Sequence, residues 1–286
     1  MVMDPLSLSK NELIKWIKHT LKYYGIKLKK KLSQVMLVDP KSYRKIFDTV
    51  ASVNDARNNV VTEIGSGFGT LTASLARASN LYIIGIELDK RFAPILREVQ
   101  ESFINVDIVI SDARLLLQSI RSIDMVVGNL PYHITSDLLT VIGKIDVRYA
   151  LVTVQKDVAD RLIAQPGTKN YGKISLFTQY LFDVELIEIL PPNLFVPPPE
   201  VFSAIVLLKR KRTYKEYSYA ESLVKCLFSF KRKNLLKSLK RCLKKNNICS
   251  TELSEKIWRK RVFQLAPEDI DILATLLKRT CLEKKE

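Results

Sequence analysis

The chain is poor in the side chains that bind transition metals. Its 286 residues include 2 histidines and 4 cysteines, at Cys226, Cys242, Cys249 and Cys281. No two cysteines form a CxxC pair, and both histidines lie far from them in the sequence, which argues against a zinc site. We therefore expect no metal, and cysteines present as buried or free thiols in a reducing compartment. That compartment is expected to be the cytoplasm.

A long hydrophobic run is also missing. No apolar stretch reaches the roughly 18 residues that a membrane helix needs, and lysines interrupt the apolar residues near the N-terminus, unlike a secretory signal. The composition, 47% hydrophobic and 27% charged, is that of a globular protein. No membrane partner is expected.

Acidic residues are scarce at both ends of the chain. The net charge of +16 divides into +6 over residues 1–32, −3 over residues 33–208 and +13 over residues 209–286. Such clustering predicts a polyanionic partner, above all a nucleic acid, held by the two flanks. The alternative is a solvated lysine-rich surface.

Strand and helix patterns alternate through the middle of the chain. Buried strands are expected at 60–64, 81–86, 106–110, 125–128 and 149–154. This rhythm predicts an α/β fold, a Rossmann-like parallel sheet with helices on both faces. Two further strands, 184–189 and 202–208, are expected to pair antiparallel at one edge, joined by a stiff proline-rich loop.

Helical patterns dominate both ends. An amphipathic helix is expected from Ser9 to about Tyr24, with Ser9 and Glu12 forming a capping box, and another from Pro40 to about Val53. Helical spacing returns at 217–230, 231–245, 251–260 and 267–281. Three parts are predicted: a basic helical extension (1–29), a catalytic domain (30–208) and a small, basic, all-helical RNA-binding domain (209–286).

A glycine-rich turn suggests a nucleoside cofactor. Gly65, Gly67 and Gly69 follow a strand that ends near Glu63, and Glu87 ends the next strand, where it can accept both ribose hydroxyls. The glycines are spaced G-x-G-x-G, which departs from the dinucleotide fingerprint. S-adenosylmethionine fits better, because it has no pyrophosphate and its cationic groups favour a nearby carboxylate such as Glu63.

Polar groups also end the next two expected strands. Asp112 could accept a hydrogen bond from the adenine amino group of the cofactor, although a helix N-cap explains it equally well. Asn129-Leu130-Pro131-Tyr132 suits a flat, amino-bearing ligand such as adenine, and an ordinary turn is the alternative. Because the carboxyl ends of parallel strands line one crevice, the four strand ends together favour a nucleoside site.

With these motifs the sequence resembles the small-subunit ribosomal RNA adenine N6-dimethyltransferases, which are related to the erythromycin-resistance RNA methyltransferases. The resemblance extends from about Lys30 to the C-terminus. Its motifs are Lys30–Leu37, Glu63–Gly69, Glu87–Asp89, Asp112–Ala113, Asn129–Tyr132, Gln155–Leu162, Lys169–Gly172, Phe195–Ser203 and Phe230–Lys233. Val35 and Met36 stand where the family usually has Asn and Phe.

The resemblance implies S-adenosyl-L-methionine-dependent dimethylation of adenosines, two adjacent ones near the 3′ end of small-subunit rRNA, during ribosome biogenesis. It implies cofactor contacts from Gln34, Val35, Leu37, Glu63, Gly65, Gly67, Glu87, Leu88, Asp112, Ala113 and Asn129. For methyl transfer we expect the Asn129 side-chain oxygen and the Leu130 carbonyl, held by Pro131, to accept the two N–H bonds of the target amine. Tyr132 and Phe195 are expected to stack on the target base.

The basic C-terminal domain is expected to hold ribosomal RNA through its phosphates. The expected contacts are Lys231, Arg232, Lys233, Arg259, Lys260 and Arg261. The protein is expected to be a monomer. Two alternatives stay open: a resistance-type methyltransferase acting on large-subunit rRNA, and a non-catalytic, RNA-binding ribosome-assembly factor.

Overall fold

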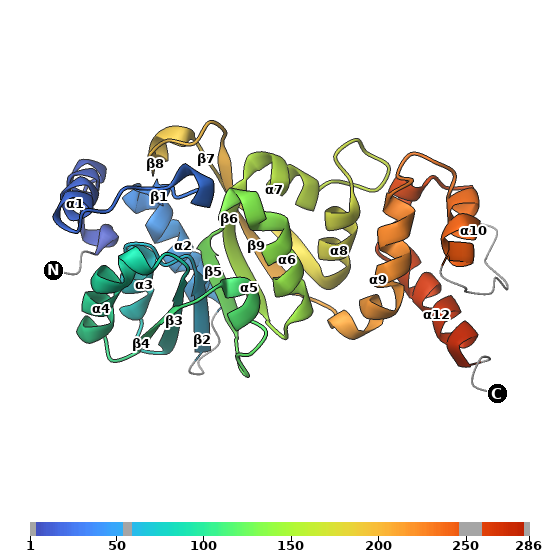
Figure 1. The fold of residues 1–286 in the computed structure, drawn as a ribbon, viewed down its shortest axis with the longest axis horizontal. Helices are drawn as coiled ribbons and strands as arrows, with labels where there is room; N and C mark the ends of the chain where they lie inside the picture. Colours follow the sequence, from blue (N-terminus) through green and yellow to red (C-terminus); the bar gives the residue numbers. More distant parts are fainter. Residues whose placement is uncertain (1–3, 54–58, 246–258, 283–286) are drawn as a thin grey trace. The chain divides into compact units, whose positions relative to one another are not determined.

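The computed structural model describes residues 4–53, 59–245 and 259–282 (Figure 1). The chain divides into two compact units, residues 1–156 with 185–209 and residues 157–184 with 210–286. The second unit thus includes segment 157–184, which the sequence had placed in the catalytic domain. The segment belongs there because its helix α8 (Lys173–Leu181) packs against α9 (Tyr214–Phe228).

A seven-stranded sheet has the strand order β4-β3-β2-β5-β6-β9-β7. Strands β2 to β6 are parallel, and β9 is antiparallel to β6. Their bounds are β2 (Asn59–Ile64), β3 (Leu81–Glu87), β4 (Val106–Ile110), β5 (Met125–Asn129), β6 (Tyr149–Gln155), β7 (Phe182–Leu190) and β9 (Ser203–Arg210). The predicted α/β class with a parallel sheet is confirmed, and the last two strands are neighbours as expected.

The centre of this sheet is where the direction of winding reverses. Strands β3 and β4 lie on one side of β2, and β5 and β6 on the other. Such a reversal opens a crevice at the carboxyl ends of the two central strands. Gly128, with φ +150°, lets β5 approach β2 closely at this point. A Cβ there would lie 2.4 Å from the Ile64 carbonyl oxygen and clash with it. Asn129 is therefore placed by a close approach of β5 to β2 that only glycine permits.

Helices connect the parallel strands, as the rhythm of the sequence predicted (Figure 1). They are α3 (Thr70–Ala76), η3 (Lys90–Phe92), α4 (Ala93–Ser102), α5 (Ala113–Leu116), η4 (Tyr132–Ile134) and α6 (Thr135–Lys144), while α2 (Pro40–Val53) leads into β2. The proline-rich segment differs from the expected plain loop. It contains η5 (Pro192–Leu194) and the short strand β8 (Phe195–Val196), which pairs antiparallel with β1 (Met36–Leu37).

The N-terminal extension folds onto the first unit. It contains η1 (Pro5–Ser7) and α1 (Lys10–Tyr23), and η2 (Lys30–Leu32) follows it. The predicted capping box is present, since the Ser9 side chain accepts from the Glu12 amide and Glu12 accepts from the Ser9 amide. Leu13 and Ile17 are completely buried in the core of the unit. The amphipathic pattern thus corresponds to a helix whose apolar face is part of the core of the first unit.

The remaining helices are α7 (Lys156–Leu162), α10 (Leu235–Lys245), η6 (Val262–Gln264) and α12 (Asp269–Leu282). The helix predicted at 251–260 falls mainly outside the described residues. Among the helices that the structure does describe, none combines the length and the apolar character needed to cross a membrane.

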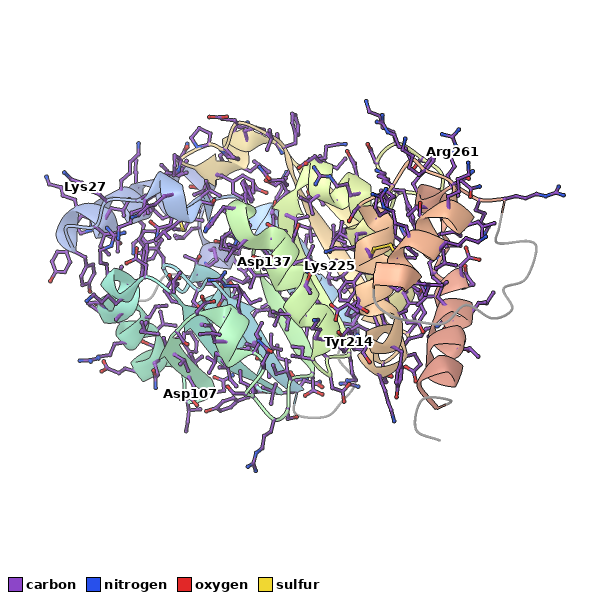
Figure 2. The ribbon with its side chains drawn as sticks, turned by 45° about the vertical axis from the view of Figure 1, so that its right-hand side comes forward. Lys27, Asp107, Asp137, Tyr214, Lys225 and Arg261 are labelled. Atoms are coloured by element: carbon purple, nitrogen blue, oxygen red, sulfur yellow. A yellow bond between two sulfur atoms is a disulfide. The ribbon has the colours of Figure 1, made fainter. Side chains whose placement is uncertain are left out.

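Two cysteines correct the expectation of thiols. Cys226 on α9 and Cys242 on α10 form a disulfide, drawn as a yellow bond in Figure 2. Their separation of 16 residues matches no local motif, and they meet because α9 and α10 pack together. Cys249 lies outside the described residues. The cysteines therefore give no argument for a reducing compartment.

Candidate active site

A cleft opens at the carboxyl ends of the central strands, entirely within the first unit. Every residue predicted to contact a cofactor lines it: Gln34, Val35, Leu37, Glu63, Gly65, Gly67, Glu87, Leu88, Asp112, Ala113 and Asn129. Pro131 lines it as well. The structure thus brings together residues spread over about a hundred positions, as expected for strand ends that share one edge of a parallel sheet.

Asn129 has one half of its amide engaged and the other half unpaired. Its Nδ2 donates to the Val35 carbonyl oxygen at 2.9 Å. Because a carbonyl can only accept, this contact fixes the amide orientation and turns Oδ1 the other way. Oδ1 is buried and has no hydrogen-bond partner in the structure. A buried, unpaired acceptor costs free energy, so it marks a place where a donor from a ligand would be stabilised.

Glu87 ties the glycine-rich turn to the end of β3. One carboxylate oxygen accepts from the Gly67 amide at 2.8 Å, and the other accepts from the Asp89 amide at 2.7 Å. Burial raises the pKa of Glu87, and these backbone donors oppose that shift. Each carboxylate oxygen can accept a second hydrogen bond, so the fixed carboxylate can still receive hydroxyl donors.

Glu63, at the end of β2, is a second buried carboxyl group in the cleft. Burial raises its pKa to about 7, against a hydrogen bond from the Thr72 hydroxyl that favours the charged form. A carboxylate ionised in so apolar a place attracts a cation strongly. Its chemistry matches a positively charged ligand.

Asp112 is a helix N-cap, which was the alternative role that the sequence left open. Its side chain caps α5 by accepting from the Arg114 amide at 2.9 Å. The Arg114 guanidinium also pairs with it at 2.6 Å and holds the pKa of Asp112 below its usual value. The carboxylate nevertheless lines the cleft, so capping and ligand contact are compatible.

Three residues predicted to handle the target base do not line the cleft. Leu130 is buried, and its amide donates to the Thr153 carbonyl at 2.9 Å. Tyr132 is partly buried, with its hydroxyl 2.6 Å from the Ser203 hydroxyl. Phe195 lies on β8 opposite Leu37, and only 2% of the residue is exposed.

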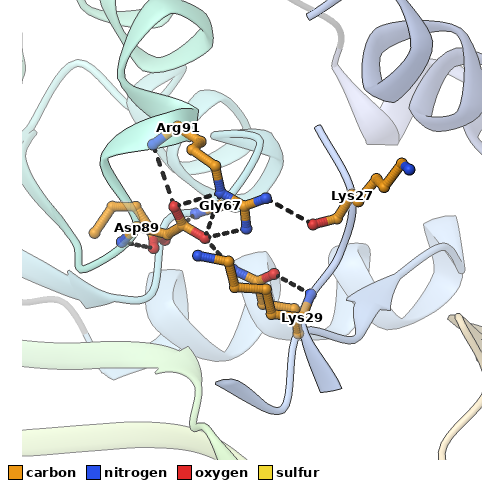
Figure 3. Close-up of polar contacts among 7 residues, drawn as sticks. Lys27, Lys29, Gly67, Asp89 and Arg91 are labelled. Atoms are coloured by element: carbon orange, nitrogen blue, oxygen red, sulfur yellow. Dashed lines mark hydrogen bonds and ion pairs between the residues drawn. The ribbon is translucent and has the colours of Figure 1, made fainter. Parts of the chain in front are cut away.

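A charged cluster that sequence reasoning missed fastens the start of the catalytic domain beside the cleft (Figure 3). Asp89 accepts from Gln34 Nε2 at 2.9 Å and pairs with the Arg91 guanidinium at 2.5 Å. Arg91 holds the pKa of Asp89 well below its usual range. Arg91 also donates to the Lys27 carbonyl, and the Gln34 oxygen accepts from the Lys29 amide. The Glu87–Asp89 motif was the sequence signal for this cluster, but it did not reveal Arg91 and Gln34 as the partners of Asp89.

Ser33 and His133 form another unpredicted contact at the cleft. Ser33 Oγ lies 3.0 Å from His133 Nδ1, and both residues line the cleft. Ser33 has φ +51°, the left-handed conformation that residues other than glycine rarely adopt. The contact joins the N-terminal segment to the residue that directly follows Tyr132.

In the second unit, the predicted RNA-contact residues come from two segments that lie side by side. The Phe263 amide donates to the Lys231 carbonyl at 3.0 Å, and the Leu235 amide to the Lys260 carbonyl at 2.9 Å. Lys260 is paired with Asp269 at 2.7 Å. Four side chains of the set are exposed: Arg232, Lys233, Arg259 and Arg261, the last labelled in Figure 2.

The chain is similar to several known proteins. A family model described as ribosomal RNA adenine dimethylase matches residues 25–266. Ribosomal RNA small subunit methyltransferase A of Thermotoga petrophila is 37% identical over 77% of this chain and 83% of that protein. A dimethyladenosine transferase of Plasmodium falciparum shares the fold, with TM-score 0.68, 23% identity and coverage of 85% and 96%. The 23S rRNA methyltransferase ErmE has TM-score 0.59, 26% identity and coverage of 86% and 99%.

Proposed function

This chain belongs to the ribosomal RNA adenine dimethylase family, and on that premise we propose how its cleft transfers methyl groups. The reaction is N6-methylation of adenine in ribosomal RNA. The proposed donor is S-adenosylmethionine, which supplies an electrophilic methyl group when bound. The observation that carries the proposal is the unpaired Oδ1 of Asn129, buried at the end of β5.

The polar groups of the cleft fit this cofactor. Glu87, fixed by the Gly67 amide, would accept the ribose hydroxyls. Glu63 offers a buried carboxylate to the cationic part of the molecule. Asp112 would accept from the adenine amino group while capping α5. Gly65 and Gly67, both with positive φ, let the backbone lie against the ligand. The other lining residues, Gln34, Val35, Leu37, Leu88 and Ala113, would complete the contact surface.

The acceptor half of the site rests on Asn129 and the backbone after it. The lone pair of an adenine amino group is delocalised into the ring, so the nitrogen is a poor nucleophile. Asn129 Oδ1 and the Leu130 carbonyl would accept its two N–H bonds and favour a pyramidal nitrogen. Pro131, with φ −57°, holds the backbone in place. Orientation and electrostatics carry this mechanism, with no obligatory general base.

For stacking on the target base we propose Phe195 together with Tyr132, whose ring is the less buried of the two. The hydrogen bond between the Tyr132 and Ser203 hydroxyls fixes one end of the ring. A fixed ring loses little conformational entropy when a base stacks on it. In the second unit, the neighbouring segments Lys231–Lys233 and Arg259–Arg261 would contact RNA phosphates.

The target that we propose is a pair of adjacent adenosines near the 3′ end of small-subunit rRNA, modified during ribosome biogenesis. The relative at 37% identity is named for the small subunit, which favours this target over the large-subunit rRNA that ErmE is named for. We propose that the protein is cytoplasmic, because its proposed substrate is ribosomal. We also propose that it acts as a monomer. The small-subunit rRNA would be its partner.

The test uses Asn129→Ala, with Asn193→Ala, an exposed asparagine of the same unit, as the matched control. Labelled S-adenosylmethionine is incubated with purified small and large ribosomal subunits, and the labelled nucleotides are mapped. We expect adjacent adenosines in small-subunit rRNA, and at least about a 100-fold slower transfer by Asn129→Ala with cofactor binding retained. Near-normal transfer by that variant would contradict the role of Asn129, and label in the large subunit would contradict the target.

A further inference from the structure

The outward face of α1 carries cations and aromatic rings. Lys15, Lys18, His19, Lys22 and Tyr23 are exposed. They occupy positions i, i+3, i+4, i+7 and i+8, which lie along one side of a helix. The Tyr23 residue is 75% exposed, and its ring is stacked with the His19 ring at 6.3 Å between centroids. We call these five residues the α1 stripe.

Little acidic charge lies on α1 beside this stripe. The only acid within α1 is Glu12, and its carboxylate closes the capping box on Ser9. Asp4, before the helix, caps η1 and pairs with Arg77 at 3.1 Å. The stripe therefore presents its positive charge and exposed tyrosine to the surroundings.

The opposite face of α1 packs against the wall of the cleft. Trp16 contacts Phe68 of the glycine-rich turn edge-on, at 5.8 Å between ring centroids. Phe68 in turn lines the cleft. The Tyr24 hydroxyl donates to Glu98 on α4. The helix is thus fixed to the glycine-rich turn, which lines the cleft, and its end is fixed to α4.

The chain after α1 continues from the stripe to the cleft. Lys27 and Lys31 are exposed along it. The Lys27 carbonyl is held by Arg91 and the Lys29 amide by Gln34 (Figure 3). The path ends at the contact of Ser33 with His133. A track of exposed lysines therefore leads from the stripe toward the place where the target base would enter.

We propose that the α1 stripe is an RNA-contacting surface, which holds a single-stranded part of the rRNA beside the cleft through its lysines and its exposed tyrosine. Positive charge along a path with an aromatic platform is the arrangement that binds single strands without reading their sequence. The proposal rests on the proposed function, because it takes ribosomal RNA as the substrate.

The experiment compares two double variants of the full chain. Lys18→Ala with Lys22→Ala removes two charges from the stripe. Arg121→Ala with Lys144→Ala removes two exposed charges near the amino ends of β5 and β6, the edge of the sheet away from the cleft. Both variants lose the same net charge. Alanine favours helix, so α1 should persist, which circular dichroism and thermal unfolding will verify.

Binding of a small-subunit rRNA fragment is measured over a range of salt concentrations. A lysine that neutralises one phosphate of a single strand contributes about 0.7 to the slope of log affinity against log salt, so the stripe variant should lose about 1.4 in slope and about 25-fold in affinity at 0.1 M salt. The control variant should bind within about twofold of wild type. Ultraviolet crosslinking should also join RNA to the peptide that contains Tyr23.

Equal affinities and slopes for the two folded variants would overturn the proposal, as would the absence of a crosslink at Tyr23 in protein that binds RNA. Methyl transfer by the wild type is measured in the same samples. If the wild type does not methylate rRNA, the proposed function fails. If it does, and the stripe variant behaves like the control, only the role of the stripe fails.

Discussion

The side-chain amide of Asn129 donates to the backbone carbonyl of Val35 at 2.9 Å, a contact that joins residues 94 positions apart. It explains why valine can stand where related sequences usually have asparagine, since the position contributes its backbone. It also leaves Asn129 Oδ1 buried and unpaired. One hydrogen bond from the N-terminal segment thus prepares the acceptor that the proposed reaction needs.

Replacing Asn129 with Asp should therefore damage the site more than its small change in shape suggests. A carboxylate oxygen would face the Val35 carbonyl oxygen with no proton between them, so the hydrogen bond becomes a repulsion. We expect a loss of about 2 kcal/mol in the free energy of unfolding and at least about a 100-fold slower methyl transfer. Chemical denaturation and single-turnover kinetics measure the two effects. Wild-type stability in the Asp variant would contradict the donor assignment.

Glu63 should make stability depend on pH. Its pKa rises from 4.5 unfolded to about 7 folded, so the folded state binds the extra proton between these values. The stabilisation is complete below pH 4.5, falls as pH rises through about 7, and amounts to about 3 kcal/mol at 1.36 kcal/mol per pH unit. Denaturation curves for wild type and Glu63→Gln should therefore differ in pH dependence between 4.5 and 7. Parallel curves would show that Glu63 titrates normally.

The same group should control cofactor affinity in the opposite direction. An ionised Glu63 attracts the cationic part of S-adenosylmethionine, so binding should strengthen as pH rises through about 7. Isothermal titration of the wild type and of Glu63→Gln tests this expectation. The glutamine variant should bind weakly at every pH, and an equal pH dependence in both proteins would assign the effect to another group.

Asp89→Ala should release the segment that Arg91 and Gln34 hold beside the cleft. Asp89 is 6% exposed and accepts charge-assisted hydrogen bonds, so its removal should cost about 2 kcal/mol of stability. Trypsin should also cut faster after Lys27 and Lys31. The control is Asp107→Ala, an exposed carboxylate on β4 that accepts from the Tyr82 hydroxyl (Figure 2). Equal cleavage rates in the two variants would show that Asp89 does not fasten this segment.

The disulfide between Cys226 and Cys242 should stabilise the helical unit. Closing a loop of this length, with a separation of 16 residues, restricts the unfolded chain by about 3 kcal/mol. A reducing agent should therefore lower the thermal midpoint of the wild type. The variant Cys226→Ala with Cys242→Ala should start lower and not respond to reductant. A wild-type midpoint that reductant does not move would contradict a stabilising role.

Much of the site could be predicted because its chemistry follows the strands. Glu63, Glu87, Asp112 and Asn129 each lie at or near the end of a strand, and strand periodicity is a local property that sequence displays. Parallel strands then must bring those ends to one edge. The order of the motifs therefore determined that the groups meet, and all of them line the cleft.

Contacts between distant residues could not be predicted in this way. The packing of distant segments decides three of them: the direction of the Asn129 amide, the burial of Phe195 on a strand paired with Leu37, and the disulfide. Sequence showed that the N-terminal extension was basic and helical and which face was apolar, but not that Trp16 of this face would contact Phe68. Local periodicity fixed the elements and the chemical groups they carry. Tertiary packing decided which groups stay unpaired, because each donor and acceptor is satisfied by neighbours that only the fold supplies.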